Sequence, residues 1–246
     1  AKGRAVLTLD GPVFLLARAF ADGPAYETMR SDCAARHWKL CQSIETLPRD
    51  SELFMWSADN SALLAVGSGP QLRAEASEIV AATVREHPTE LLADAVRNTL
   101  AQLVTFRAAV DFKRWPEGGA ALTIPGVIHR FFPHEFDRLM RSRQQQGRLD
   151  VEGLNVLYSA VVWLSLAGLV VLLLQARPEK PVADLLLAVA MALLVNAAAA
   201  GGLSVVADRY QARLIWLVPF CFAVLLLCQQ RRRALASRAP SIVPGG

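Results

Sequence analysis

The sequence is poor in the residues and motifs on which most recognisable active sites depend. It has four cysteines, four histidines and three tyrosines in 246 residues, and only 20% of its residues are charged. It contains no glycine-rich nucleotide loop, metal-ligand cluster, nucleophile elbow or haem-attachment motif. No motif therefore identifies a reaction, and we predict no catalytic residue, no metal and no cofactor for this chain.

A broad basic surface is also lacking, although the net charge is +4. Residues 1–150 hold 18 basic and 18 acidic residues, whereas residues 151–246 hold 8 and 4. The whole excess comes from Arg231, Arg232, Arg233 and Arg238, which follow an apolar run. Nucleic-acid binding needs a basic face with many phosphate contacts. We therefore expect no nucleic-acid partner and interpret the arginines as a membrane-topology signal.

The beginning of the chain carries no signal-peptide pattern. The segment AKGRAVLTLDGP has no apolar core of sufficient length, and its first residue is Ala rather than Met. We expect a processed chain or a piece of a longer protein, in which an upstream element carries residues 1–150 across the membrane.

Three long apolar runs lie near the C-terminus. Leu154–Gln175 has 22 uncharged residues, about 33 Å of helix, against a hydrocarbon core of about 30 Å. Leu185–Ala207 has 23 residues, and Leu214–Cys228 only 15, or about 22 Å. Arg213 and Arg231 are therefore expected to snorkel to the interfaces at the two ends of the third run. We predict three transmembrane helices in residues 151–230, at about 154–175, 185–207 and 212–229.

The arginines set the predicted orientation. Because positive residues favour the cytoplasmic side, Arg231–Arg233 place the basic tail, residues 231–246, in the cytoplasm. Counting back puts residues 1–150 outside, in the periplasm if the membrane is a bacterial inner membrane. Arg141, Arg143 and Arg148 lie on the wrong side by this rule, which long translocated domains often ignore.

Residues 1–150 are expected to form a loop-rich, mostly helical domain, so the fold class is mainly α. Residues 12–22 are expected to form a short helix, or the end of a membrane segment. Residues 71–86 and 89–109 predict two helices that form a hairpin at Pro88; the second places Leu92, Val96, Leu100, Leu103 and Val104 on one broad face. Residues 44–70 are expected to be loops with a strand or packed turn. Residues 127–140 predict an amphipathic helix, or two pieces around Pro133, at the membrane interface.

Cys33 and Cys41 are separated by eight residues, a distance that a helical turn and a reversal can close. A disulfide is expected if the domain faces an oxidising compartment. Free thiols and a metal site with His37 are the alternatives, although a zinc site needs about four ligands. Glu75 and Glu78 are one turn apart, as catalytic carboxylates can be, but also fit a solvated helix face.

Small residues recur along the second predicted span. The expected packing set comprises Ala188, Ala192, Asn196, Ala200, Gly201 and Gly202. Small side chains at a spacing of four let helix backbones approach closely. An amide at membrane depth needs a hydrogen-bond partner, so we expect Asn196 to face a neighbouring helix; a ligand or transport role for it is the alternative.

The turn between the second and third spans gathers Asp208, Arg209, Tyr210 and Arg213. An arginine pair at the outer interface could bind a lipid or other anionic headgroup, including a pyrophosphate. The other interpretation is anchoring, with Arg213 snorkelling and Arg209 paired with Asp208.

The segment GGLSVVADRYQARLIWLVP, together with VFLLARAFADGPA, Cys33, Cys41 and FMWSADNS, resembles parts of a group of polytopic inner-membrane proteins of high-GC proteobacteria. These proteins loosely resemble polytopic glycosyltransferases that use lipid-linked sugars, known as the GT-C class. In such enzymes the catalytic carboxylate lies on the first extracytoplasmic loop, near an N-terminus that this chain does not have. The resemblance therefore transfers no catalytic residue.

Two main functions remain open. The first is a non-catalytic accessory or scaffold subunit of a membrane complex, which would contact membrane lipids and other transmembrane subunits. The second is the C-terminal part of a polytopic glycosyltransferase, whose partner would be the missing N-terminal spans. A transporter is a weaker third, because a single membrane amide and no intramembrane charge offer little for a substrate path.

Overall fold

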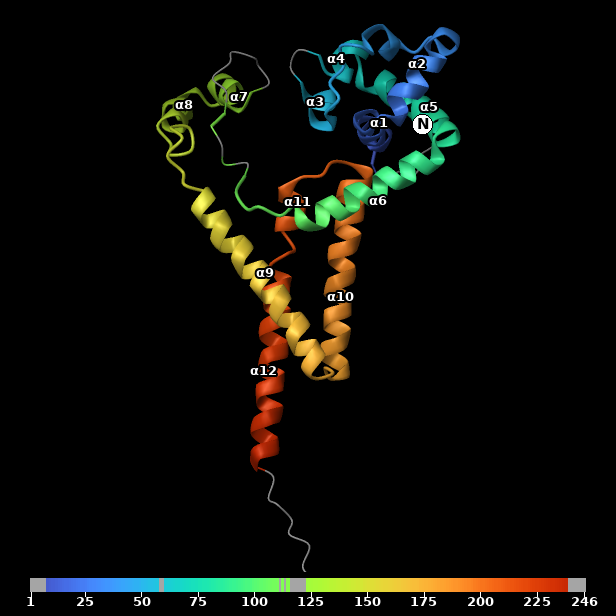
Figure 1. Ribbon diagram of the computed structural model, residues 1–246. Helices are drawn as coiled ribbons and strands as arrows, with labels where there is room; N and C mark the ends of the chain where they lie inside the picture. The colour runs from blue at the N-terminus through green and yellow to red at the C-terminus, as the bar shows by residue number, and fades with distance from the viewer. Residues whose placement is uncertain (1–7, 58–59, 111, 113, 116–122, 239–246) are drawn as a thin grey trace, which may run out of the picture.

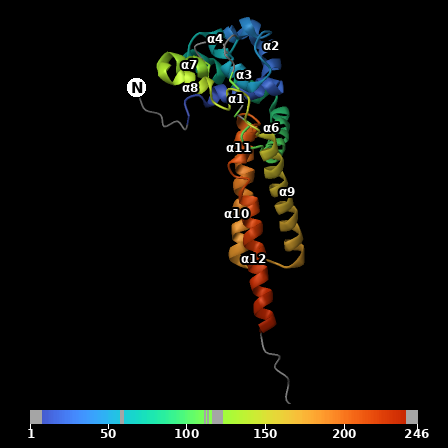
Figure 2. The ribbon, with the colours of Figure 1, turned by 90° about the vertical axis from the view of Figure 1, so that its left-hand side faces the viewer.

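The computed structural model describes residues 8–57, 60–110, 112, 114–115 and 123–238, and all regular structure in these ranges is helical. Figures 1 and 2 show a head of short helices at one end of a bundle of three long helices. The predicted fold class is confirmed: mainly α, with three long apolar helices at the C-terminal end.

The head is built from five α-helices and one 3₁₀-helix. They are α1 (Gly11–Asp22), α2 (Pro24–Arg36), η1 (Lys39–Ser43), α3 (Ser51–Trp56), α4 (Ala62–Val66) and α5 (Gly69–Glu86). Helix α1 packs against α2, α3 and α5, so it occupies the centre of the head. Phe20 on α1 is fully buried and contacts the rings of Tyr26 and Phe54, at centroid distances of 5.7 Å and 5.0 Å.

Residues 44–70 contain two short helices, α3 and α4, where the sequence suggested a strand or a packed turn. Asp50 explains the start of α3, because its side chain accepts hydrogen bonds from the backbone N–H groups of Glu52 and Leu53, each 2.9 Å long. Such a cap satisfies donors that the first helical turn leaves unpaired. A local polar contact thus determines where α3 begins. The Pro and Gly residues of this stretch had favoured a loop in the sequence analysis.

The disulfide between Cys33 and Cys41 is present, with a Cα–Cα distance of 5.7 Å. The segment that the disulfide closes is held against α5 by Glu75 and Glu78, the two carboxylates that lie one helical turn apart. Glu75 accepts a 2.7 Å hydrogen bond from the backbone N–H of Leu40, and Glu78 accepts one of 3.2 Å from Nε1 of Trp38. Glu75 is half-buried and Glu78 is exposed, as expected for a solvated helix face, and both also anchor this loop.

Helix α6 (Pro88–Val104) connects the head to the bundle. It ends five residues before the predicted end at residue 109, and Thr105 is extended. It does not fold back along α5 as a hairpin, because its main packing partners are η2 and α10 of the bundle. Figure 1 shows α6 crossing over the end of α10, between the head and the long helices.

The bundle consists of α9 (Glu152–Gln175), α10 (Lys180–Ala197) with the π-helix η2 (Ala198–Gly202), and α12 (Leu217–Arg238). A short helix, α11 (Asp208–Ala212), precedes α12. The second span thus ends at Gly202 rather than residue 207. The third apolar stretch that could cross a membrane runs over Asp208–Leu235 and contains the predicted residues 212–229. Helix α12 continues through Arg231–Arg233, which the sequence had assigned to a separate tail.

These three helices are long and apolar enough to cross a membrane, and their outer faces carry exposed leucines. Gly168 lets α9 approach α12, because a Cβ at that position would lie 2.4 Å from the ring of Phe222. At the end of the bundle far from the head, Arg232 donates to Glu179 at 2.8 Å. The Arg231–Arg233 cluster and the linker between α9 and α10 therefore lie on the same side.

Residues 124–140 form two helices, α7 (Ile124–Phe131) and α8 (Pro133–Met140), with the division at Pro133. This agrees with one of the two alternatives predicted from the sequence, two helical pieces around Pro133. They pack on each other, with the rings of His129 and Phe136 in edge contact at 4.9 Å. Figure 1 shows them beyond the start of α9, at the level of the head. The membrane-interface location predicted for residues 127–140 stays a prediction.

Candidate functional site

The residues that the sequence singled out around the last turn lie where the head meets the bundle. We call this region the junction: the C-terminal half of α6 with the following residues to Arg107, the π-helix η2, the segment 203–207, α11, and Glu52 of α3. In this region side chains of the head, α6, α9, α10 and α11 form hydrogen bonds with residues of other elements.

The first contact of the junction is a close approach of two helices. Gly201 and Gly202 of η2 lie against α6, and a Cβ at position 201 would stand 2.4 Å from the backbone oxygen of Asn98. At position 202 the nearest atom would be Oγ1 of Thr99, at an ordinary 3.5 Å. Only glycine at position 201 allows this separation. The run AAAGG thus supplies the small residues that let η2 touch another backbone.

The second contact is made by Gln102 of α6, which is fully buried. Its Oε1 accepts a 2.8 Å hydrogen bond from the N–H of Ala207, and its Nε2 donates to the carbonyl of Ala207 at 3.0 Å. One side-chain amide therefore satisfies both backbone groups of an extended residue. This pairing holds the segment that follows the second span against α6.

The face of α6 that carries these contacts is polar. Asp94, Asn98 and Gln102 are all buried and follow each other at intervals of four. Asn98 donates to Asp22 of α1 at 2.9 Å, and Asp22 is held in turn by Arg18 at 2.6 Å and 2.8 Å. The polar face of α6 is thus bonded to the head and the bundle together.

Helix α11 forms the third contact. Asp208 accepts a 2.6 Å hydrogen bond from the backbone N–H of Arg107, whose side chain pairs with Glu152 at the start of α9. Arg209 pairs with Glu52 of the head and not with its neighbour Asp208, which corrects the anchoring pair expected from sequence. Asp208 and Arg209 are thus each bonded to a residue that is distant in the chain.

Side chains of two spans, α9 and α10, form hydrogen bonds with α11. Nδ2 of Asn196 on α10 donates to the carbonyl of Tyr210 at 3.2 Å and to Oε1 of the fully buried Gln211 at 2.7 Å. The hydroxyl of Tyr158 on α9 donates to the carbonyl of Ala212 at 3.0 Å. Asn196 therefore bonds to α11, at the end of the bundle.

The other members of the expected packing set are distributed differently. Ala188 and Ala192 are exposed on α10, whereas Ala200 and Gly201 are buried at the π-helix. Close packing is thus concentrated in the last turns of this span, where α6 crosses it.

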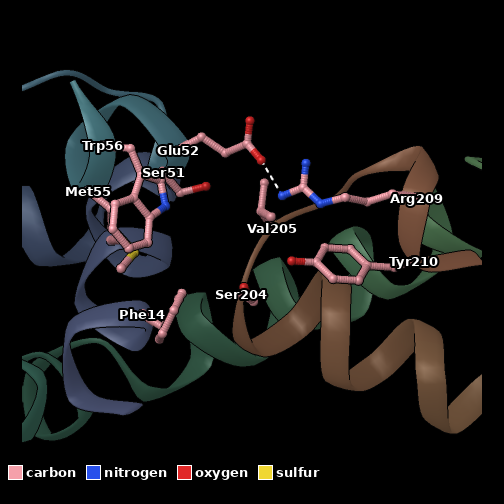
Figure 3. Close-up of a pocket in the computed structure, with 10 residues that line it drawn as sticks. Phe14, Ser51, Glu52, Met55, Trp56, Ser204, Val205, Arg209 and Tyr210 are labelled. Atoms are coloured by element: carbon pink, nitrogen blue, oxygen red, sulfur yellow. Dashed lines mark hydrogen bonds and ion pairs between the residues drawn. The ribbon is translucent and has the colours of Figure 1, made fainter. Parts of the chain in front are cut away.

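The structure does not bring the two arginines of the turn together on one anion site. Figure 3 shows the Arg209 guanidinium directed at Glu52, so its charge is matched within the chain. Arg213 is exposed and has no ion pair among the described residues. The cavity beside Arg209 and Tyr210 is about 40 Å³ in volume, large enough for water only, and Phe14, Met55 and Trp56 form its other wall.

A second cavity lies next to it on the head, between α1, α3, α4 and α5. We call it the head cleft; it has a volume of about 240 Å³. Its apolar lining consists of Val13, Phe14, Met55, Trp56, Leu63 and Leu72. Asp10 and Arg73, which form a 2.9 Å ion pair, also line it. Among the described residues, no group of His, Cys, Asp and Glu could hold a metal ion.

Sequence reasoning missed the residues that organise the junction, namely Glu52, Asn98, Gln102 and Gln211. The repeat Asp94, Asn98, Gln102, opposite the apolar stripe of the same helix, was a signal that could have found two of them. No local signal pairs Glu52 with Arg209, which is 157 residues away.

No family model, curated protein or solved structure matches this chain. The resemblance to polytopic membrane proteins and glycosyltransferases thus remains an expectation, and function has to be argued from the junction and the head cleft.

The two glycines of η2 give a matched test of the junction. Replacing Gly201 by Ala forces a Cβ against the backbone of α6 and should lower the free energy of unfolding by about 1–3 kcal/mol. Gly202→Ala meets only ordinary contacts, and should be neutral or stabilise by up to about 1 kcal/mol. Thermal unfolding in detergent measures both, and equal destabilisation of the two variants would contradict the close approach at Gly201.

Proposed function

We propose that this chain is a non-catalytic accessory or scaffold subunit of a membrane complex. Its three spans anchor it in the membrane, the junction holds the head in a fixed position above them, and the head cleft binds an apolar side chain of a partner protein. The observation that carries this proposal is the head cleft, an apolar cavity on a head that is bonded to the spans.

The composition of the head cleft supports a protein partner. Trp56 is 70% exposed at its edge, and Leu63 is 44% exposed on the facing helix. Exposed tryptophan next to an apolar pocket is typical of the anchor positions of protein interfaces. A volume of about 240 Å³ is below the range of about 300–1,000 Å³ usual for small-molecule sites. A single large apolar side chain fits it better than a whole ligand.

The use of the charged residues at the junction supports the same function. Asp208 and Arg209, which an enzyme could use on a phosphate, are bonded to Arg107 and Glu52. Gln102 and Asn196 bond to segments that follow the second span. These contacts join the head to the bundle, which is what a scaffold needs to keep a docking site at a constant height above the membrane.

The proposal includes an orientation. The head is periplasmic and the C-terminus cytoplasmic, in a bacterial inner membrane. The arginines at the end of α12 favour the cytoplasm, and they lie at the end of the bundle opposite the head. The Cys33–Cys41 disulfide fits an oxidising compartment on the other side.

The alternative function is the C-terminal part of a glycosyltransferase that uses lipid-linked sugars. One observation favours it: Arg213 directly follows α11 and is exposed, with its guanidinium unpaired among the described residues. If it binds a lipid phosphate, Arg213→Gln should abolish sugar transfer in cells while the chain stays assembled. A scaffold should retain its partner and its phenotype in that variant.

Photo-crosslinking tests the head cleft. With benzoylphenylalanine in place of Leu63, we expect irradiation of cells to give one discrete protein adduct. The same group in place of Val84, exposed on the far part of α5, should give none. The crosslinked protein should co-purify with the unmodified chain in mild detergent, and Leu63→Glu should remove it without a change in thermal stability.

Three results would contradict the docking role: no adduct at position 63, an adduct of the same kind at both positions, or an unmodified chain that purifies as an isolated monomer. If the adduct is a protein that carries further transmembrane spans and a catalytic carboxylate, the glycosyltransferase alternative gains instead.

Cysteine labelling tests the orientation. In a chain with Cys221→Ala and Cys228→Ala, Ser77→Cys on α5 and Ser237→Cys on α12 place one exposed thiol at each end of the molecule. A membrane-impermeant maleimide should label position 77 in intact spheroplasts, and position 237 only after lysis. The opposite pattern would put the head in the cytoplasm and remove the orientation from the proposal.

A further inference from the structure

The exposed side of α6 is apolar. Leu92, Val96, Leu100 and Val104 are 66%, 52%, 59% and 59% exposed. At 100° per residue this stripe lies on the side of the helix opposite to the buried Asp94, Asn98 and Gln102. The helix therefore has the reverse of the usual arrangement in a soluble protein, where the apolar face is covered and the polar face is exposed. Exposing four adjacent apolar side chains to water is energetically unfavourable.

The stripe is continuous with the outer surface of a membrane span. An apolar groove of about 600 Å³ runs between α6 and the end of α10. Val96 and Leu100 form one wall, and Leu194, Val195 and Leu203 form the other. Leu194 and Val195 belong to the helix that is apolar enough to cross a membrane, and both are exposed on its outside. Whatever solvent surrounds this end of α10 also reaches the stripe.

The direction of α6 fits a lipid surface. Figures 1 and 2 show that α6 lies across the head end of the bundle, whereas α9, α10 and α12 run along it. A helix in this position can lie along the boundary of a membrane that the three long helices span. Its polar face is bonded to the head and the junction, and its apolar face is free, which is the pattern of an interfacial helix.

We propose that α6 lies in the membrane plane with the stripe Leu92–Val96–Leu100–Val104 immersed in one leaflet, and that the groove between α6 and α10 holds the acyl chain of a lipid. The helix that links the head to the spans is then itself a membrane-binding element. It limits how far the head can tilt from the membrane surface, and it is a second lipid contact besides the spans.

Spin labels read out this contact directly. In the background Cys221→Ala, Cys228→Ala, a nitroxide is attached at Val96→Cys or Leu100→Cys. The chain is reconstituted in vesicles of phosphatidylethanolamine and phosphatidylglycerol, and collision rates with oxygen and with a water-soluble nickel chelate are measured. Control labels are Leu187→Cys on the outside of α10 for lipid, and Ala74→Cys on α5 for water; both parent side chains are exposed.

We expect both stripe labels to show the high oxygen accessibility of the label at position 187 and to lose nickel accessibility relative to the label at position 74. Nickel accessibility equal to that of position 74 would place α6 in water and overturn the proposal. Low accessibility to both reagents would mean that protein covers the stripe, either a second copy or another subunit, and would overturn it as well. Two label positions guard against a local misfold, which loss of helical circular dichroism would reveal.

Discussion

The side-chain amide of Gln102 pairs with both backbone polar groups of Ala207, and the placement of the head on the spans depends on this contact. Gly201 makes it possible, because only a residue without a Cβ lets the end of the second span approach α6. The other bonds of the junction build on this approach. Arg209 reaches Glu52 of the head, and Asn196 reaches α11. One polar helix face therefore replaces the apolar interface that usually joins two parts of a protein.

This arrangement explains why α6 has its two faces reversed. A polar face that bonds to the head and to the end of a span leaves the apolar face outside, and an apolar exterior is stable only where the surroundings are apolar. The membrane leaflet in which we propose that α6 lies would provide such surroundings at the level of the junction. The head, α6 and the spans then form a single body, which suits a protein that presents the head cleft to a partner near the membrane surface.

Much of the architecture could be predicted from local sequence. Apolar length gave the spans α9 and α10, and Pro88, Pro133 and Gly23 marked real helix ends. The separation of Cys33 and Cys41 allowed the disulfide. Contacts between residues that are distant in the chain could not be predicted from local sequence. Glu52 and Arg209 are 157 residues apart, and no residue near either one identifies the other as its partner. The sequence placed the end of the second span at residue 207 because Leu203–Ala207 is mostly apolar. In the structure this segment leaves the helix, and its Ala207 bonds to Gln102.

The distance between the head and the spans tests the central claim most directly. Nitroxide labels at Ser77→Cys on α5 and Leu187→Cys on α10, in the background Cys221→Ala, Cys228→Ala, allow pulsed electron resonance to measure it in vesicles. A head bonded to the spans gives one narrow distance distribution, which broadens when Gln102 is replaced by Ala. A distribution that is already broad in the chain with native Gln102, or one that Gln102→Ala leaves unchanged, would contradict a junction that holds the two parts together.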